Sequence, residues 1–136
     1  MSTRSKLSFL ALAIGVFTVT VTDAYTIGVS YDSTLGRYLV DGNGRTLYYN
    51  EGDTAATSNF EGDRNTWPSF YTSNIDVPGE LDRSDFMTIV SRDGTLQTTY
   101  RNWPLYQYIY DQSSGDINGN EIAGMRVVPP TKNYAP

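Results

Sequence analysis

Tyrosine and aspartate residues recur at one spacing in two short stretches of the sequence. The stretch 104–111, PLYQYIYD, contains Tyr106, Tyr108 and Asp111, and the stretch 46–53, TLYYNEGD, contains Tyr48 and Asp53. A pair of carboxylates can hydrolyse a glycosidic bond when the two groups flank the substrate. Here, however, the two aspartates occupy corresponding places after expected strands, where a carboxylate accepts the amide hydrogens of a turn. We therefore predict that these five residues form a structural motif and that the chain has no catalytic residue.

The composition removes several kinds of chemistry. The sequence contains no cysteine and no histidine. Thiol nucleophiles, imidazole bases and the usual zinc sites are therefore excluded, and so are disulfides and a lipid anchor on an N-terminal cysteine. Neither a Gly-x-Ser-x-Gly elbow nor a phosphate-binding loop is present. We predict that the protein is not an enzyme and uses no cofactor.

One stretch could hold a ligand through oxygen atoms. The segment 116–121, DINGNE, places Asp116, Asn118 and Asn120 at alternate positions, as a calcium loop does at its start. Glu121 then occupies the position of the sharp-turn glycine, and Val127 that of the bidentate glutamate. An ordinary Asn-Gly turn is the favoured interpretation, and a ligand or metal site at these three residues is the alternative.

The first 24 residues have the order of a secretory signal peptide. Arg4 and Lys6 precede an apolar run of about fifteen residues, which ends near the small residue Ala24. A retained membrane anchor is the alternative, but the run is short for a span of roughly 20 apolar residues. We expect cleavage before Tyr25, a mature domain at 25–136, and a secreted protein at the cell surface with no membrane anchor.

The charge of the mature chain limits its partners. Of the 15 acidic and 10 basic residues, 14 acidic and 8 basic residues follow residue 24, which gives that part a net charge of −6. Its one lysine is Lys132. An acidic chain lacks the basic face that nucleic acids and anionic lipids require. We expect no nucleic-acid partner.

The mature chain is expected to be all-β. Tyr, Thr and Val occur in short runs separated by Gly, Asn and Asp, which is typical of strands joined by turns. No apolar period of 3.6 residues is sustained outside the leader. The turns are expected at 41–44, 92–94 and 101–104, and the first two each join a hairpin, 38–40 with 46–50 and 86–90 with 96–100. The expected strands are Tyr38–Val40, Thr46–Asn50, Phe86–Val90, Leu96–Tyr100, Leu105–Tyr110 and Arg126–Val128.

The tyrosine row has two interpretations. Because side chains alternate across a strand, Tyr106, Tyr108 and Tyr110 would share one face, and Leu105 and Ile109 the other. Large groups on both faces predict a central strand that is packed on both sides. The alternative is an exposed row that binds sugars or joins neighbouring molecules.

A constant offset relates two parts of the chain. Leu47, Tyr48 and Asp53 precede Leu105, Tyr106 and Asp111 by 58 residues, and Gly36 precedes Gly94 by the same number. Such self-similarity indicates an internal duplication. We predict a single small antiparallel β domain, sandwich or barrel-like, built from related units at about 36–53 and 94–111.

These motifs resemble a known family. The chain is similar to the secreted and lipoprotein repeats with a Tyr-x-[Phe/Trp/Tyr]-x-x-Asp motif, which Tyr106, Tyr108 and Asp111 match fully. Tyr48 and Asp53 match its ends, although Asn50 replaces the central aromatic residue. The stretches SRDGTLQTTYRNWPLY, SSGDINGNE and NTWPSF resemble further elements of the family in the expected order.

The departures from the family pattern affect what the resemblance implies. Many relatives have a cysteine pair before the first Trp-Pro, where this chain has Phe60 and Arg64, and many begin at a lipidated cysteine. A late Trp-Tyr pair of the family is also replaced, by GMRVV. The resemblance implies an extracytoplasmic β domain without a lipid anchor, and it implies no activity.

Two functions remain open from the sequence. The first is a non-catalytic structural protein of the cell surface that assembles with itself into a sheath, fibre or coat. The scarcity of lysine supports this function, because lysines on edge strands normally block edge-to-edge pairing. The alternative is an extracytoplasmic module that binds a glycan, a metal ion or another envelope protein.

Overall fold

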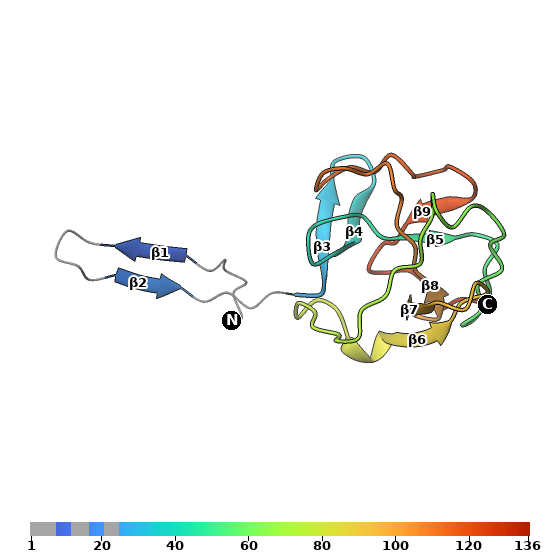
Figure 1. Ribbon diagram of the computed structural model, residues 1–136, viewed down its shortest axis with the longest axis horizontal. Helices are drawn as coiled ribbons and strands as arrows, with labels where there is room; N and C mark the ends of the chain where they lie inside the picture. Colours follow the sequence, from blue (N-terminus) through green and yellow to red (C-terminus); the bar gives the residue numbers. More distant parts are fainter. Residues whose placement is uncertain (1–7, 12–16, 21–24) are drawn as a thin grey trace.

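The structure, a computed structural model, describes residues 8–11, 17–20 and 25–136 (Figure 1). Strands β1 (Ser8–Ala11) and β2 (Phe17–Thr20) pair antiparallel with each other and with no other described strand. The predicted signal peptide contains both strands, but its cleavage site at residue 24 lies outside the described residues. Cleavage therefore stays a prediction. No helix in the described ranges is long and apolar enough to cross a membrane.

The rest of the described chain is an all-β domain, as predicted. Its strands are short, and every pairing between them is antiparallel. They form small sheets in the orders β3-β4, β5-β9 and β6-β7-β8, with one 3₁₀ turn, η1, before β6. The elements are β3 (Ile27–Asp32), β4 (Gly36–Asp41), β5 (Tyr48–Asn50), η1 (Arg83–Asp85), β6 (Phe86–Val90), β7 (Leu96–Tyr100), β8 (Trp103–Pro104) and β9 (Met125–Val127).

Two hairpins, β3-β4 and β6-β7, frame the domain. Gly36 is the first residue after the turn of β3-β4, and Gly94 lies in the turn of β6-β7. Their φ angles are 83° and 85°, a conformation that glycine adopts without the steric cost of a Cβ. The Oδ2 atom of Asp32 accepts the amide hydrogens of Thr34 and Leu35 at 2.9 Å and closes the first turn. The second turn is closed by Ser91, whose N–H donates to the Thr95 carbonyl at 2.7 Å. The local sequence therefore determines both reversals.

Several predicted strands are confirmed, and one pairing differs. The bounds of β6 and β7 are those predicted, and β9 lies one residue before its expected position. The turn after β4 forms as expected, with a bridge between Val40 and Thr46. Beyond Leu47 the chain leaves β4, and β5 pairs with β9. Strand β3 was not predicted, and β8 occupies the second half of the turn that was expected at 101–104.

The prediction of a strand at Leu105–Tyr110 is wrong. Only Tyr106 of this segment forms β-bridges, and residues 109–110 lie in a turn. The Asp111 N–H donates to the Tyr108 carbonyl at 3.1 Å, which reverses the chain. Tyr106 is consequently buried, whereas Ile109 and Tyr110 are exposed. The expected row of three tyrosines on one face does not form.

The two halves of the domain meet at a bridge between equivalent residues. The Tyr48 N–H donates to the Tyr106 carbonyl and the Tyr106 N–H to the Tyr48 carbonyl, both at 2.8 Å. Tyr48 also bridges Val127, while Tyr106 bridges Ser69, a residue 58 positions before Val127. Interactions thus recur at the offset found in the sequence. An antiparallel bridge between equivalent residues relates the two units by an approximate two-fold axis.

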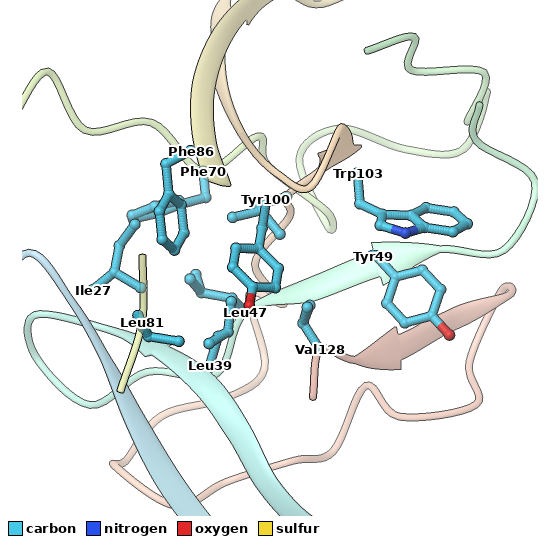
Figure 2. Packing of buried hydrophobic residues seen from close by; sticks show 11 residues of the cluster. Ile27, Leu39, Leu47, Tyr49, Phe70, Leu81, Phe86, Tyr100, Trp103 and Val128 are labelled. Carbon is cyan, nitrogen blue, oxygen red and sulfur yellow. The ribbon is translucent and has the colours of Figure 1, made fainter. Parts of the chain in front are cut away.

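The core consists of two clusters of buried side chains. Figure 2 shows the larger one, in which Tyr49 lies beside Trp103 with ring centroids 4.7 Å apart. The Nζ atom of Lys132 lies 4.2 Å from the centroid of the Tyr49 ring. The smaller cluster surrounds the central bridge and contains Tyr38, Val40, Tyr48, Trp67, Tyr106, Met125 and Val127. Burial of each large apolar side chain stabilises the domain by about 1.5–3 kcal/mol.

Candidate functional site

The motif tyrosines and aspartates are joined across the two units. The Tyr48 hydroxyl donates to Asp111 Oδ2 at 2.5 Å, and the Tyr106 hydroxyl donates to Asp53 Oδ2 at 2.7 Å. Each tyrosine therefore bonds the aspartate of the other unit. All four residues are buried, and the backbones of the two tyrosines meet at the central bridge. We call these four residues the crossed Tyr–Asp pairs.

The second oxygen of each carboxylate closes a loop in its own unit. Asp53 Oδ1 accepts the N–H groups of Asn59 at 2.6 Å and Phe60 at 3.1 Å. Asp111 Oδ1 accepts the N–H of Asn118 at 2.9 Å. Phe60 and Asn118 are 58 residues apart, so this loop closure also recurs at the offset. Each aspartate thus accepts backbone N–H from a loop of its own unit, and the hydrogen bond from the tyrosine of the other unit was not predicted.

Burial shifts the ionisation of both members of each pair. Burial raises the pKa of Asp53 and of Asp111 above the ordinary value, although hydrogen bonds from the tyrosines and the loop amides oppose the shift. Burial, reinforced by the adjacent carboxylates, also raises the pKa of the Tyr48 and Tyr106 hydroxyls far above 10. These phenols stay protonated over the whole neutral range, so they act as permanent hydrogen-bond donors.

Ser58 and Arg64 surround the Tyr106 hydroxyl, which bonds Asp53. The Ser58 hydroxyl lies 2.6 Å from the Tyr106 hydroxyl, and Arg64 Nη2 donates to Ser58 Oγ at 2.7 Å. The Arg64 guanidinium lies over the Tyr106 ring at 5.2 Å and over the Phe60 ring at 5.7 Å. Here cation–π contacts and hydrogen bonds hold the loop.

The motif tyrosine Tyr108 lies outside the crossed pairs. Its ring stacks on Trp67, with centroids 4.2 Å apart and an interplanar angle of 27°. It also contacts the edges of Tyr48 at 6.5 Å and Tyr110 at 5.3 Å. A Cβ at Gly119 would lie 2.6 Å from Trp67 and 3.0 Å from Tyr108, so only glycine fits there. Tyr108 links the buried motif to the surface.

The three candidate ligand residues take part in turns. Asp116 Oδ2 accepts the N–H groups of Gln112 at 2.9 Å and Ser113 at 3.0 Å. The Asn118 N–H donates to Asp111, and Asn120 Oδ1 accepts the Val127 N–H at 3.1 Å. No group of three or more carboxylate, thiol or imidazole side chains in the described ranges could hold a metal ion. A ligand site at these residues stays a prediction.

Strand β6 exposes backbone groups at the edge of its sheet. The Asp85 carbonyl accepts the Arg101 N–H, and the Ser91 N–H donates to Thr95, so these two residues face β7. Backbone groups alternate along a strand, and therefore those of Thr88 and Val90 point away from β7. β6 ends its sheet, and no partner for these outward groups lies in the described part of the chain. The strand has no charged residue, and Met87 and Val90 are exposed.

Strand β3 has a corresponding edge in the first unit. Leu39 of β4 donates its N–H to Val128, which lies away from β3. Its partner Val29 therefore directs its backbone groups away from β4, as does Tyr31 two residues later. Within the described residues these groups also lack a partner, and Tyr31 is 69% exposed. Over residues 25–136 the domain thus has two open strand edges, one at β3 and one at β6.

The comparisons with known proteins identify one relationship. Residues 87–126 match a family model described as a secreted repeat of unknown function, which is the family that the sequence resembles. The match begins in β6 and ends in β9, and it contains Tyr106, Tyr108 and Asp111. The description agrees with the predicted extracellular location. No curated protein and no solved structure matches the chain.

Proposed function

We propose that the protein is a non-catalytic structural subunit of the cell surface, which joins copies of itself through the edges of β3 and β6. The observation that carries the proposal is the pair of open, nearly uncharged strand edges. The one charged residue on either strand is Asp32, whose Oδ2 already accepts two turn amides. An uncharged edge lacks the lysines with which secreted β proteins commonly prevent edge pairing.

The position of the edges supports assembly beyond a dimer. A subunit with one open edge can join one neighbour, whereas a subunit with two open edges can join two. Each contact would use the outward groups of two residues on each strand, which gives about four backbone hydrogen bonds. At about 0.5–1.5 kcal/mol for each bond, a contact is weak. Assembly would therefore require a high local concentration, as exists at a cell surface.

The acidic charge gives assembly an expected pH dependence. The part after residue 24 has 14 acidic and 8 basic residues, so identical subunits repel each other at neutral pH. Protonation of carboxylates lowers this repulsion. We expect larger particles as the pH falls toward the isoelectric point, and no covalent cross-links because the chain lacks cysteine.

The experiment places one lysine on each edge. Light scattering and electron microscopy would compare the wild-type protein with Thr88→Lys on β6, Tyr31→Lys on β3, and the double variant. Tyr71→Lys is the matched control, because Tyr71 is exposed and lies on neither edge. We expect the double variant to stay monomeric, while wild type and control assemble.

The single variants distinguish two geometries of assembly. If β6 pairs with β6 and β3 with β3, each single variant stops at a dimer. If β6 pairs with β3, each single variant alone stays monomeric, and a single variant mixed with wild type ends a growing chain. A wild-type protein that stays monomeric at high concentration and acidic pH would contradict the proposal and favour the binding module.

A further inference from the structure

A polar cleft lies beside the crossed Tyr–Asp pairs and away from both strand edges. Its volume is about 450 Å³, within the range of small-molecule sites. The turn after β4 contributes Asp41, Asn43 and Arg45 to its lining, and the segment after β8 contributes Gln107, Tyr108 and Asp111. The cleft is therefore formed by both units of the domain.

The two carboxylates of the cleft are occupied by the protein itself. Asp41 Oδ1 accepts the N–H groups of Asn43 at 2.8 Å and Arg45 at 2.9 Å, and its Oδ2 accepts Gln107 Nε2 at 2.8 Å. Asp111 is buried, and its carboxylate holds Tyr48 and the Asn118 amide. These groups shape the walls. They do not offer a free carboxylate pair to a substrate.

The groups that remain available are planar and polar. Gln107 lines the cleft and donates through Nε2 to Asp41, so its Oε1 is left as an acceptor. Arg45 uses Nη1 on the Asp111 carbonyl at 2.6 Å, which leaves further N–H donors. The Asn43 carboxamide, which has both donors and an acceptor, makes no hydrogen bond within the described residues. The lining of the cleft thus has both hydrogen-bond donors and hydrogen-bond acceptors available.

Tyr108 adds an aromatic surface to these polar groups. The ring is partly exposed, lines the cleft and is held by its stacking on Trp67. A pyranose ring has the matching chemistry. Its hydroxyls both donate and accept hydrogen bonds, and its C–H face packs on aromatic rings. The lining has one cation, Arg45, and two carboxylates, Asp41 and Asp111, which favours a neutral sugar over an anion.

From this combination we infer that the cleft between the 41–46 turn and residues 107–111 is a binding site for a neutral saccharide. Asn43, Arg45 and Gln107 bind the hydroxyls, and Tyr108 packs against the ring. The inference is independent of edge pairing, because none of these residues belongs to the open edges of β3 or β6.

The test is a titration of the full secreted chain followed by nuclear magnetic resonance. The probes are maltohexaose, cellohexaose, laminarihexaose and chitohexaose. Each is titrated up to roughly 10 mM, so that binding with a Kd as weak as about 1 mM, or about −4 kcal/mol, is detected. We expect at least one probe to shift the backbone amides of the cleft. Asn43→Ala should weaken that binding about tenfold, which is the loss of one hydrogen bond.

Asn65→Ala is the matched control. Asn65 also donates its N–H to an aspartate two residues earlier, Asp63, at 2.9 Å, and its side chain is exposed outside the cleft. It should bind the probe as wild type does, and both variants should keep the wild-type melting temperature. Absence of binding by all four probes would overturn the inference. Shifts confined to other surfaces, or equal affinity for wild type and Asn43→Ala, would overturn it as well.

Discussion

Removal of one phenolic hydroxyl should destabilise the whole domain. In Tyr48→Phe, Asp111 loses the 2.5 Å hydrogen bond from the hydroxyl, and the Gly119 N–H loses its acceptor at 3.1 Å. Tyr48 is fully buried, so water cannot replace the hydroxyl without rearrangement. The loss of a hydrogen bond to a charged group costs about 1.5–3 kcal/mol. For a domain of this size we expect the melting temperature to fall by roughly 5–12 °C.

A double-mutant cycle separates the crossed arrangement from pairing within each unit. Tyr48→Phe combined with Asp111→Asn removes both members of one crossed pair, and we expect a coupling free energy of about 1–3 kcal/mol. Tyr48→Phe combined with Asp53→Asn affects residues of the same unit that share no hydrogen bond. Those two changes should be additive within about 0.5 kcal/mol.

Urea denaturation followed by tryptophan fluorescence is a suitable assay, because Trp67 and Trp103 are both buried. The free energy of unfolding would be compared for wild type, the three single variants and the two double variants at neutral pH. Strong coupling between Tyr48 and Asp53, with none between Tyr48 and Asp111, would refute the crossed pairs.

Three further predictions concern packing, ionisation and processing. Gly119→Ala should destabilise the domain by about 1–3 kcal/mol, because the added Cβ would contact Trp67, whereas Gly79→Ala has open space and should be neutral in the same thermal melt. Carboxyl titration by nuclear magnetic resonance should give Asp53 and Asp111 midpoints above the ordinary value near 3.9, because burial disfavours their charged form. Because the folded state binds the Asp53 and Asp111 protons more tightly than the unfolded state, protonation of the two carboxyls stabilises the fold. This stabilisation is fully present below the ordinary pKa and is lost as the pH rises through the raised pKa of the folded state. Midpoints below the ordinary pKa would contradict the predicted direction. The mass of the secreted protein should correspond to a chain that starts at Tyr25, and a species starting at Met1 would disprove cleavage.

Local signals account for the parts of the fold that the sequence predicted. β6 and β7 are runs of β-branched and apolar residues on either side of Arg92–Gly94, and the glycine supplies the positive φ that the turn requires. β9 is followed by Pro129 and Pro130, which cannot continue a ladder. In each case the pattern and the turn chemistry agree over a few residues.

Tertiary contacts decide the parts that were predicted wrongly. The segment Leu105–Tyr110 has the composition of a strand, but its neighbours at Ser69 and Tyr48 pair only with Tyr106. The chain then turns, and the turn places the Asp111 carboxylate where it accepts the hydrogen bond from Tyr48 of the other unit. This hydrogen bond joins residues that are 63 positions apart, so the sequence around Asp111 contains no local pattern that predicts it.

The site was predicted in its residues but not in its connections. The 58-residue offset identifies Tyr48 with Tyr106 and Asp53 with Asp111, and it therefore reports equivalence. The offset does not say which residues are in contact, because a tyrosine could bond the aspartate of its own unit or that of the other unit. Here an antiparallel bridge relates the units by an approximate two-fold axis, and each aspartate accepts a hydrogen bond from the tyrosine of the other unit.

The crossed Tyr–Asp pairs make each unit an incomplete half. Each half supplies one tyrosine hydroxyl and one aspartate carboxylate. The hydroxyl and carboxylate of one half do not bond each other, because each bonds its counterpart in the other half, across the two-fold axis. A polypeptide that contained one half would bury its motif only against a second copy, as a symmetric dimer. We predict that the present chain behaves as such a dimer with its two members covalently linked, so fragments divided between residues 70 and 86 should reassociate into the intact domain.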